Sequence, residues 1–393
     1  MTETLLNIDV IYLALNLFLL LVFVKVGNII SKGYDYWGNA IWCIVFFSLI
    51  QGLRYGRGND YFHYSYQFEY RNIDTNPFFN TFNIFLESIG ITRYSCFIVY
   101  AFIFVTCGMC FLKKYRVYAK YTFPCFLIGF LNFNEYVIRQ ALSYSFVFLF
   151  LLHLFKGKYV HIRELLHDKK HICVLILFAF LTISIHTGNI IILLAFITMY
   201  FLIRYPIHYI ITIPIYFLCV YVLPNIFDFS LLQPLLDFVA ENNDRAQEYV
   251  FRQEQWFSSN GAEDKYTRNA IIQLFELIGT SSLFFLGYKT IVEKLNGDLA
   301  LSTMLNVFFV GISFQSLFRN LEILNRIGHT LSYIGFIVLA IVIYHKPKGW
   351  RGRYSILYAS LIWFFYDYFK YLFMPKPLFT KFIWDAPINI NFF

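Results

Sequence analysis

The sequence predicts an all-α integral membrane protein that crosses the bilayer about twelve times. Of its 393 residues, 59% are hydrophobic and only 14% are charged. Soluble chains are about 25% charged, and a soluble protein of this length has too little interior for so much apolar surface. Apolar runs recur from end to end, and a spanning helix needs roughly 20 such residues. The bilayer is therefore the natural solvent for this polytopic chain.

Twelve apolar segments fit the length of a span, although the fourth and the sixth are short. They lie near 6–26, 37–53, 94–112, 121–133, 137–155, 171–185, 188–203, 209–223, 269–288, 299–318, 331–344 and 354–372. A polar stretch at 224–268 interrupts the series with acids, bases and aromatic residues. We expect a single membrane domain, 1–393, with a large extracytoplasmic loop of amphipathic helices at 224–268.

The basic residues of the short loops predict the orientation. Cytoplasmic loops carry an excess of lysine and arginine. Such residues follow the third, fifth and eleventh segments, which all end on the same side: Lys113, Lys114, Arg116, Lys120, Lys156, Lys158, Arg163, Lys169, Lys170, Lys346, Lys348, Arg351 and Arg353. That side is the predicted cytoplasmic one, and both termini then face outward. The N-terminus has no basic n-region and no small-residue cleavage site, so the first segment reads as a retained span.

Arginine dominates the opposite, outer side of the predicted membrane domain. A planar guanidinium binds phosphate oxygens in a bidentate way and is always charged. An outer cluster at the membrane boundary therefore suits a phosphate or diphosphate headgroup, although individual arginines can instead pair with acids of the outer loops. The formal net charge of +8 is accounted for by basic residues in the short loops and at the headgroup boundary, so it does not indicate a nucleic-acid partner. The outer arginines are Arg54, Arg57, Arg71, Arg93, Arg139, Arg245, Arg252, Arg268, Arg319 and Arg326.

The first motif, RYGRGNDYFHYSYQF, begins where the second predicted span emerges outside. Its glycines allow a tight turn with exposed backbone amides, a shape that can hold anions. Arg54 and Arg57 add positive charge beside Gly58, and Asp60 and Tyr64 follow. An interfacial helix with Asp60 as its N-cap is the structural alternative, and both can hold together.

The second motif, NFNEYVIRQALSYSF, places Arg139 and Gln140 at the start of an apolar span. A charge in or near the bilayer is costly and usually marks a function or a partner. Glu135 lies one turn earlier, so a simple Glu135–Arg139 ion pair is the structural alternative.

The third motif, SIHTGN, lies at an outer turn between two close spans and contains His186. Histidine titrates near neutrality and can relay a proton or donate to a phosphate. A histidine at a helix end can also be purely structural, and that alternative stays open.

The fourth motif, RNLEILNRIGHTLSY, contains Arg319 and places Arg326 where another apolar helix begins. Glu322 and His329 lie one turn to either side of Arg326. An ion pair with Glu322 is the structural alternative to a role in binding substrate.

Taken in order, these motifs resemble the EpsG-like family of Wzy-type polysaccharide polymerases. The matching positions are Arg54, Gly58, Asp60, Tyr64, Arg139, Gln140, Ala141, His186, Thr187, Asn325 and Arg326. Two positions depart from the pattern: Gly188 stands where relatives often have serine or alanine, and His329 where an aromatic residue is common. Both departures bear on which substrate is bound rather than on the class of protein.

The resemblance implies a bacterial inner-membrane enzyme with a glycosyltransferase-C-like helical fold and its active site facing outward. Such an enzyme joins undecaprenyl-diphosphate-linked oligosaccharide repeat units, transferring the growing chain from its lipid diphosphate to an incoming unit. Membrane lipids are the other expected partners, and a chain-length regulator is left open. The outer loops contain no DxD-type metal cluster, so we expect no metal and no other cofactor.

The resemblance also assigns roles to residues. Those expected to hold the diphosphate are Arg54, Arg57, Arg139 and Arg326. Asp60 and His186 lead as the base for the acceptor hydroxyl, with Glu135 and Glu322 behind them. Gly58, Tyr64, Gln140 and Arg319 complete the predicted substrate-binding set.

Three other classes remain open at the level of sequence. A flippase or transporter of lipid-linked oligosaccharide also uses buried arginines, but these should line a path from both faces. A membrane O-acyltransferase should place its histidine toward an inner acyl donor. A sugar transferase with a lipid monophosphate donor differs only in its product.

Overall fold

The computed structural model describes residues 10–58, 60–70, 77–157, 159, 161–226, 270–319, 321–345, 351–373 and 381–382. These residues are helical almost throughout, which confirms the predicted helical class. They form two compact units: unit 1 comprises 1–202, 336–346 and 364–393, and unit 2 comprises 203–335 and 347–363. The polar loop predicted at 224–268 lies outside the described residues from 227 onward.

Most elements of unit 1 follow one another along the N-terminal half of the chain, and one short strand comes from residues 381–382. They are α2 (Val10–Ser31), α3 (Tyr36–Gly52), β1 (Arg54–Tyr55), α4 (Tyr61–Tyr70), α5 (Pro77–Ser88), α6 (Cys96–Leu112), η1 (Lys113–Tyr118), α7 (Ala119–Tyr136), α8 (Ile138–Gly157), α9 (Ile162–His167), α10 (Lys169–Ile185), η2 (Thr187–Asn189), α11 (Ile190–Leu202) and β2 (Lys381–Phe382). Aspartate caps begin two of these helices, because Asp35 accepts from Gly38 N at 2.5 Å and Asp168 from His171 N at 3.1 Å.

Unit 2 consists of α12 (Tyr209–Phe217), η3 (Leu218–Val222), α13 (Leu223–Ile226), α16 (Ala270–Lys294), α17 (Leu299–Leu317) and α18 (Glu322–Ser332). Two later helices contribute to both units. All of α19 (Gly335–Tyr344) after its first residue belongs to unit 1, and α20 (Arg351–Phe373) passes from unit 2 to unit 1 after Trp363.

Six described helical segments are long and apolar enough to cross a membrane. They are Val10–Ser31, Cys96–Tyr136, Ile138–Gly157, Ala270–Lys294, Leu299–Leu317 and Leu324–Tyr344. The second of these is bent at η1 into α6 and α7, which pack together: the Phe104 ring lies 6.0 Å from that of Phe126. α3 and α10 are each 17 residues long, slightly short of a typical span. The predicted count of twelve spans remains a prediction.

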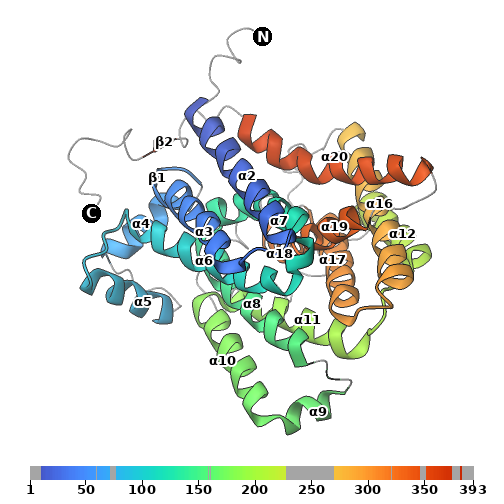
Figure 1. The fold of residues 1–393 in the computed structure, drawn as a ribbon, viewed down its shortest axis with the longest axis horizontal. Coiled ribbons are helices and arrows are strands. Elements are labelled where there is room, and N and C mark those ends of the chain that lie inside the picture. Colours follow the sequence, from blue (N-terminus) through green and yellow to red (C-terminus); the bar gives the residue numbers. More distant parts are fainter. Residues whose placement is uncertain are drawn as a thin grey trace. The chain divides into compact units, whose positions relative to one another are not determined.

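The core of unit 1 is an aromatic helix bundle. α2 packs against α3 and α7, α3 against α6, α6 against α8, and α8 against α10 (Figure 1). The ring of Phe104 lies within 6.3 Å of the rings of Phe47, Phe126, Phe130, Phe133 and Phe148. A Cβ on Gly27 of α2 would lie 2.4 Å from the carbonyl oxygen of Ala119, so glycine permits the close contact between α2 and α7.

At α3 and α8 of unit 1, a lysine contacts one end of the helix and an arginine lies at the other. At the start of α3, the Lys113 ammonium lies 5.2 Å from the centre of the Trp37 ring, whereas Arg54 follows the end of this helix. A 17-residue helix is about 25 Å long. At the end of α8, Lys114 Nζ donates to Phe155 O at 3.0 Å, whereas Arg139 lies in its first turn. The separation agrees with the predicted sidedness, although which end is cytoplasmic remains a prediction.

One short pair of strands in unit 1 was not predicted from the sequence. β1 pairs antiparallel with β2, so that Arg54 faces Phe382 and Tyr55 faces Lys381. In Figure 1 the two strands lie side by side near α4. Strands of two residues carry no alternating hydrophobic pattern, so no sequence signal indicated them. The pairing joins the C-terminal segment to the loop that follows α3.

Candidate functional site

The loop after α3 has a backbone shape that only glycine readily adopts. Gly56 has φ +66° and Gly58 has φ +94°. A Cβ on Gly58 would lie 2.1 Å from the carbonyl oxygen of Glu135, at the end of α7. Both the positive φ and the lack of space therefore favour glycine here. The first sequence motif thus packs directly on the second.

A buried ion pair connects this loop to α7. Arg57 Nη2 lies 2.8 Å from Glu135 Oε1, and both side chains are 0% exposed. Glu135 Oε2 accepts from Tyr12 OH at 3.2 Å and also from Tyr371 OH. The Arg57 guanidinium lies over the Tyr12 ring, 4.3 Å from its centre. A buried ion pair is tolerated when further hydrogen bonds satisfy its charges, and the two tyrosines supply these for Glu135.

Arg54 lies beside this pair and is also buried, at 2% exposure. Its two terminal nitrogens both donate to Asn134 O at 3.4 Å, and its guanidinium lies 5.5 Å from the centre of the Phe97 ring. Its Nε makes no hydrogen bond within the described part of the chain. Burial lowers the pKa of Arg54, and the nearby Glu135 carboxylate opposes that effect.

The formal charges of the three buried side chains do not cancel. Arg54 and Arg57 contribute two positive charges and Glu135 contributes one negative charge, so the formal charges of these three side chains sum to +1. Buried charge is costly unless it is compensated. We name these three side chains the arginine cluster, and its excess charge suits an anionic group.

The start of α8 brings Arg139 against α4. Val137 interrupts the helix with φ −123° and ψ 62°, so that Arg139 falls in the first turn of α8. Its guanidinium lies 5.9 Å from the centre of the Tyr64 ring. Asp60 is half-buried immediately before α4, and its carbonyl accepts from Tyr64 N at 3.0 Å. The structure gives Glu135 an ion-pair partner, Arg57, that lies far from it in sequence and that the spacing of Glu135 and Arg139 did not suggest.

The third motif meets the second through a buried amide. Asn189 Oδ1 accepts from Gln140 Nε2 at 3.4 Å, and Asn189 Nδ2 donates to Ser143 Oγ at 2.8 Å. Asn189 N also donates to the carbonyl of His186 at 3.1 Å. His186 is half-buried and ends α10 in an extended conformation. Three of the four sequence motifs thus assemble within unit 1.

Sequence reasoning missed two residues of this assembly, Tyr12 and Tyr371. They come from α2 and α20, near opposite ends of the chain, yet both donate to Glu135. A tyrosine inside an apolar segment is the only local signal at either position. No spacing rule connects residues so far apart in sequence.

The fourth motif belongs to unit 2. Arg319 Nη2 donates to Val220 O at 3.5 Å, and Asn325 Nδ2 donates to Arg319 O at 3.2 Å. Arg326 is exposed on α18, where its carbonyl accepts from Thr330 Oγ1 at 2.7 Å. The arginine cluster consists wholly of unit 1, so the roles expected of Arg319 and Arg326 remain predictions.

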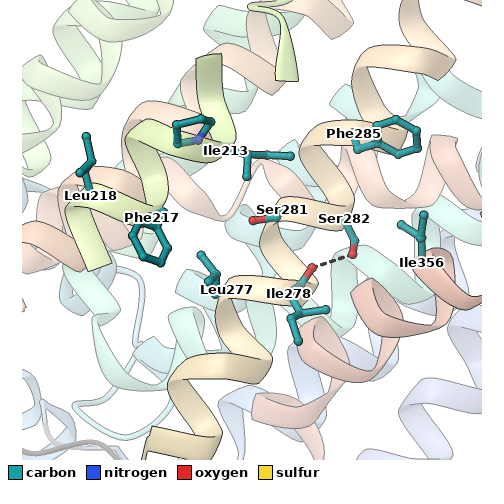
Figure 2. Close-up of a pocket in the computed structure, with 10 residues that line it drawn as sticks. Ile213, Phe217, Leu218, Leu277, Ile278, Ser281, Ser282, Phe285 and Ile356 are labelled. Carbon is teal, nitrogen blue, oxygen red and sulfur yellow. Dashed lines mark hydrogen bonds between the residues drawn. The ribbon is translucent and has the colours of Figure 1, made fainter. Parts of the chain in front are cut away.

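Unit 2 also contains an apolar groove with a volume of about 650 Å³ (Figure 2). Its walls are α12 with η3, α16 and α20, and the hydroxyls of Ser281 and Ser282 are its few polar groups. Ser282 Oγ donates to Ile278 O at 2.6 Å, so this hydroxyl is already engaged. None of its lining residues was predicted to be functional. The groove suits a hydrocarbon chain rather than bond-making chemistry.

The family to which the chain belongs is decided by a family model that matches residues 39–383. The chain belongs to the EpsG family. No curated protein and no solved structure matches it. The EpsG match includes every residue predicted to be functional, whereas Tyr12 precedes it. Together with the long apolar helices, EpsG membership indicates a membrane protein with a general role in polysaccharide polymerisation.

Proposed function

We propose that this EpsG-family protein joins undecaprenyl-diphosphate-linked oligosaccharide units on the outer face of the bacterial cytoplasmic membrane. The observation that carries the proposal is the arginine cluster, which places two buried guanidiniums and one carboxylate at the end of a helix bundle. A diphosphate bound there would meet the excess positive charge. The family match supports the same general class of activity.

The proposed reaction is a glycosyl transfer. The bond between the anomeric carbon of the growing chain and its diphosphate oxygen breaks, and the diphosphate leaves with the bonding electrons. A bond forms between that carbon and a hydroxyl oxygen of the incoming unit, whose proton passes to a base. Arg54 and Arg57 would stabilise the charge that develops on the leaving diphosphate, because their positions are fixed beforehand by Asn134 and Glu135. Arg139, in the first turn of α8, would also help to hold the diphosphate.

The base remains either Asp60 or His186 in this proposal. Glu135 is a weaker candidate because Arg57, Tyr12 and Tyr371 all engage its carboxylate. We assign Glu135 the role of a counter-ion that positions Arg57. An imidazole has an ordinary pKa close to the working pH, which suits general-base catalysis by His186.

The test uses a deletion strain that carries wild type, Arg57→Ala, Arg139→Ala or His186→Ala, with surface polysaccharide separated on gels. Collapse of the ladder to single repeat units in the variants, and its restoration by wild type, is the expected result. Arg163→Ala is the matched control, since Arg163 is exposed on α9 and should leave the ladder unchanged.

Two other outcomes would contradict polymerisation. Loss of even the single repeat unit from the cell surface would indicate a flippase. A full-length ladder that lacks only acetyl groups would indicate an O-acyltransferase.

A further inference from the structure

Two stacked tyrosines lie exposed on α4, close to the arginine cluster in sequence. The rings of Tyr66 and Tyr70 are 6.0 Å apart with an interplanar angle of 25°. The two residues are 55% and 64% exposed. A tyrosine ring combines a large apolar face with a polar hydroxyl, and such rings are common at binding surfaces. These two present that combination outward.

A charged pair adjoins the exposed rings. Arg93 forms an ion pair with Glu69, and the two side chains are 28% and 43% exposed. The Arg93 guanidinium lies 5.9 Å from the centre of the Tyr66 ring and 4.7 Å from that of Tyr94. Arg93 also donates to Tyr94 OH at 2.6 Å. These contacts hold the guanidinium of Arg93, a hydrogen-bond donor, and the carboxylate of Glu69, an acceptor, beside the Tyr66 ring.

A series of aromatic contacts connects this surface to the arginine cluster. The Tyr94 ring lies 6.0 Å from the Tyr55 ring, which lies 6.0 Å from the Tyr61 ring. Tyr61 stacks at 4.4 Å on Phe97, and the same Phe97 lies beneath Arg54. Tyr61 and Tyr94 are 0% and 7% exposed, whereas Tyr66 and Tyr70 are 55% and 64% exposed. The series therefore leads from a buried positive charge to the surface.

We propose that the surface formed by Tyr66, Glu69, Tyr70 and Arg93 binds the oligosaccharide of the lipid-linked substrate. This inference rests on the proposed function, in which the arginine cluster holds the diphosphate. Sugars offer C–H faces that stack on aromatic rings, and hydroxyls that bond to carboxylates and guanidiniums. The surface takes no part in bond-making. It positions the sugar that adjoins the diphosphate.

The charges at this surface favour a sugar over an anionic lipid headgroup. Tyrosines also occur at the headgroup level of membrane proteins. However, the charges of Glu69 and Arg93 cancel within their ion pair, so the surface offers little attraction to an anion. A neutral, hydroxyl-rich ligand suits such a pair, because the carboxylate and the guanidinium can each form a hydrogen bond to one of its hydroxyls.

The experiment measures glycan binding by the full-length protein in lipid nanodiscs. The probe is a soluble oligosaccharide released by mild acid from the polysaccharide of the host strain, and saturation-transfer NMR reports its contact with the protein. We expect wild type to saturate the C–H protons of the sugar. The Tyr66→Ala/Tyr70→Ala variant should bind about tenfold more weakly.

Three further variants define the interpretation. Tyr66→Phe/Tyr70→Phe keeps the rings and should retain most of the affinity. Tyr358→Ala removes a tyrosine of similar exposure, 60%, from the first half of α20 and should bind as wild type does. Arg163→Ala, at an exposed position on α9, should also keep its affinity, because it lies outside the proposed surface. If the double alanine variant fails to fold, the single Tyr70→Ala variant, at the most exposed ring, replaces it.

Several outcomes would overturn the inference. One is wild-type protein that restores the polysaccharide ladder in cells but binds no glycan, which leaves polymerisation standing. A second is unchanged affinity after both rings are removed. A third is lower recovery of the alanine variant from membranes with unchanged glycan affinity, which would make the rings headgroup anchors. Glycan binding by a wild type that fails to restore a ladder would instead contradict the proposed function alone.

Discussion

Arg57 Nη2 and Glu135 Oε1 lie 2.8 Å apart, and neither side chain is exposed. Removing one partner of such a pair leaves an uncompensated buried charge, which typically costs about 3–5 kcal/mol. Replacing both partners with apolar residues of similar volume is often neutral. Stability and activity can therefore be separated at this pair.

The first prediction concerns these two residues. Glu135→Ala should unfold in detergent with a free energy lowered by about 3–5 kcal/mol, because Arg57 remains buried without its carboxylate. Arg57→Met/Glu135→Met should recover most of that stability and still form no polysaccharide ladder. Thermal unfolding and gel analysis measure the two effects. A double variant that makes a normal ladder would show that the pair is purely structural.

The second prediction concerns the two tyrosines that bond to Glu135. Tyr371→Phe keeps the ring but removes a hydrogen bond to a carboxylate, so the free energy of unfolding should fall by about 1.5–3 kcal/mol. Tyr12→Phe should act in the same direction, since Tyr12 OH donates at 3.2 Å. Tyr358→Phe, at an exposed position, is the control. Equal stability of Tyr371→Phe and this control would contradict the assignment.

The third prediction compares two glycines with nearly the same φ angle. Gly58 has φ +94° and Gly90 has φ +88°. A Cβ at Gly58 would meet Glu135 O at 2.1 Å, whereas one at Gly90 would meet nothing within 4 Å. Gly90→Ala should cost about 1–2 kcal/mol of backbone strain and keep the ladder. Gly58→Ala should abolish it, as the loop can no longer pack on α7.

The fourth prediction tests which end of unit 1 faces the cytoplasm. Of the seven cysteines, only Cys173 is exposed, so the Cys173→Ser variant removes the exposed thiol that would otherwise react with the label. In intact cells, a membrane-impermeant maleimide should label Ser88→Cys at the end of α5 and leave Arg116→Cys in η1 unlabelled until the cells are permeabilised. Both positions are exposed in the structure. The reverse labelling pattern would invert the proposed orientation.

The sequence predicted the components of the site better than their contacts. Motifs such as Arg54 to Tyr64 are short and local, so their residue types and order can be read directly. The sequence offered Arg139 only as an alternative partner of Glu135, from their helical spacing, and it gave no sign of Arg57, which comes from a separate loop. The break at Val137 also turns Arg139 into a new helix, and no strong helix-breaking residue marks that position.

Long apolar segments could be predicted because the length and hydrophobicity of each segment are local properties of the sequence. Their number is harder to obtain, as α6 and α7 show by continuing into each other through η1. The contributions of Tyr12, Tyr371 and β2 depend on packing between segments far apart along the chain. Neither periodicity nor spacing contains that information.

The hydrogen bonds to Glu135 bear on the order of events during biosynthesis. Tyr12 is in the first described helix to leave the ribosome and Tyr371 is in the last, yet both reach the same carboxylate. β1, which contains Arg54, is also paired with β2, which is made later still. Membrane insertion of the early helices would therefore leave Glu135 without its hydrogen bond from Tyr371, and β1 without its partner strand. A nascent chain would acquire these contacts only once α20 and β2 are in place, so partly translated protein should not engage the proposed lipid-linked substrate.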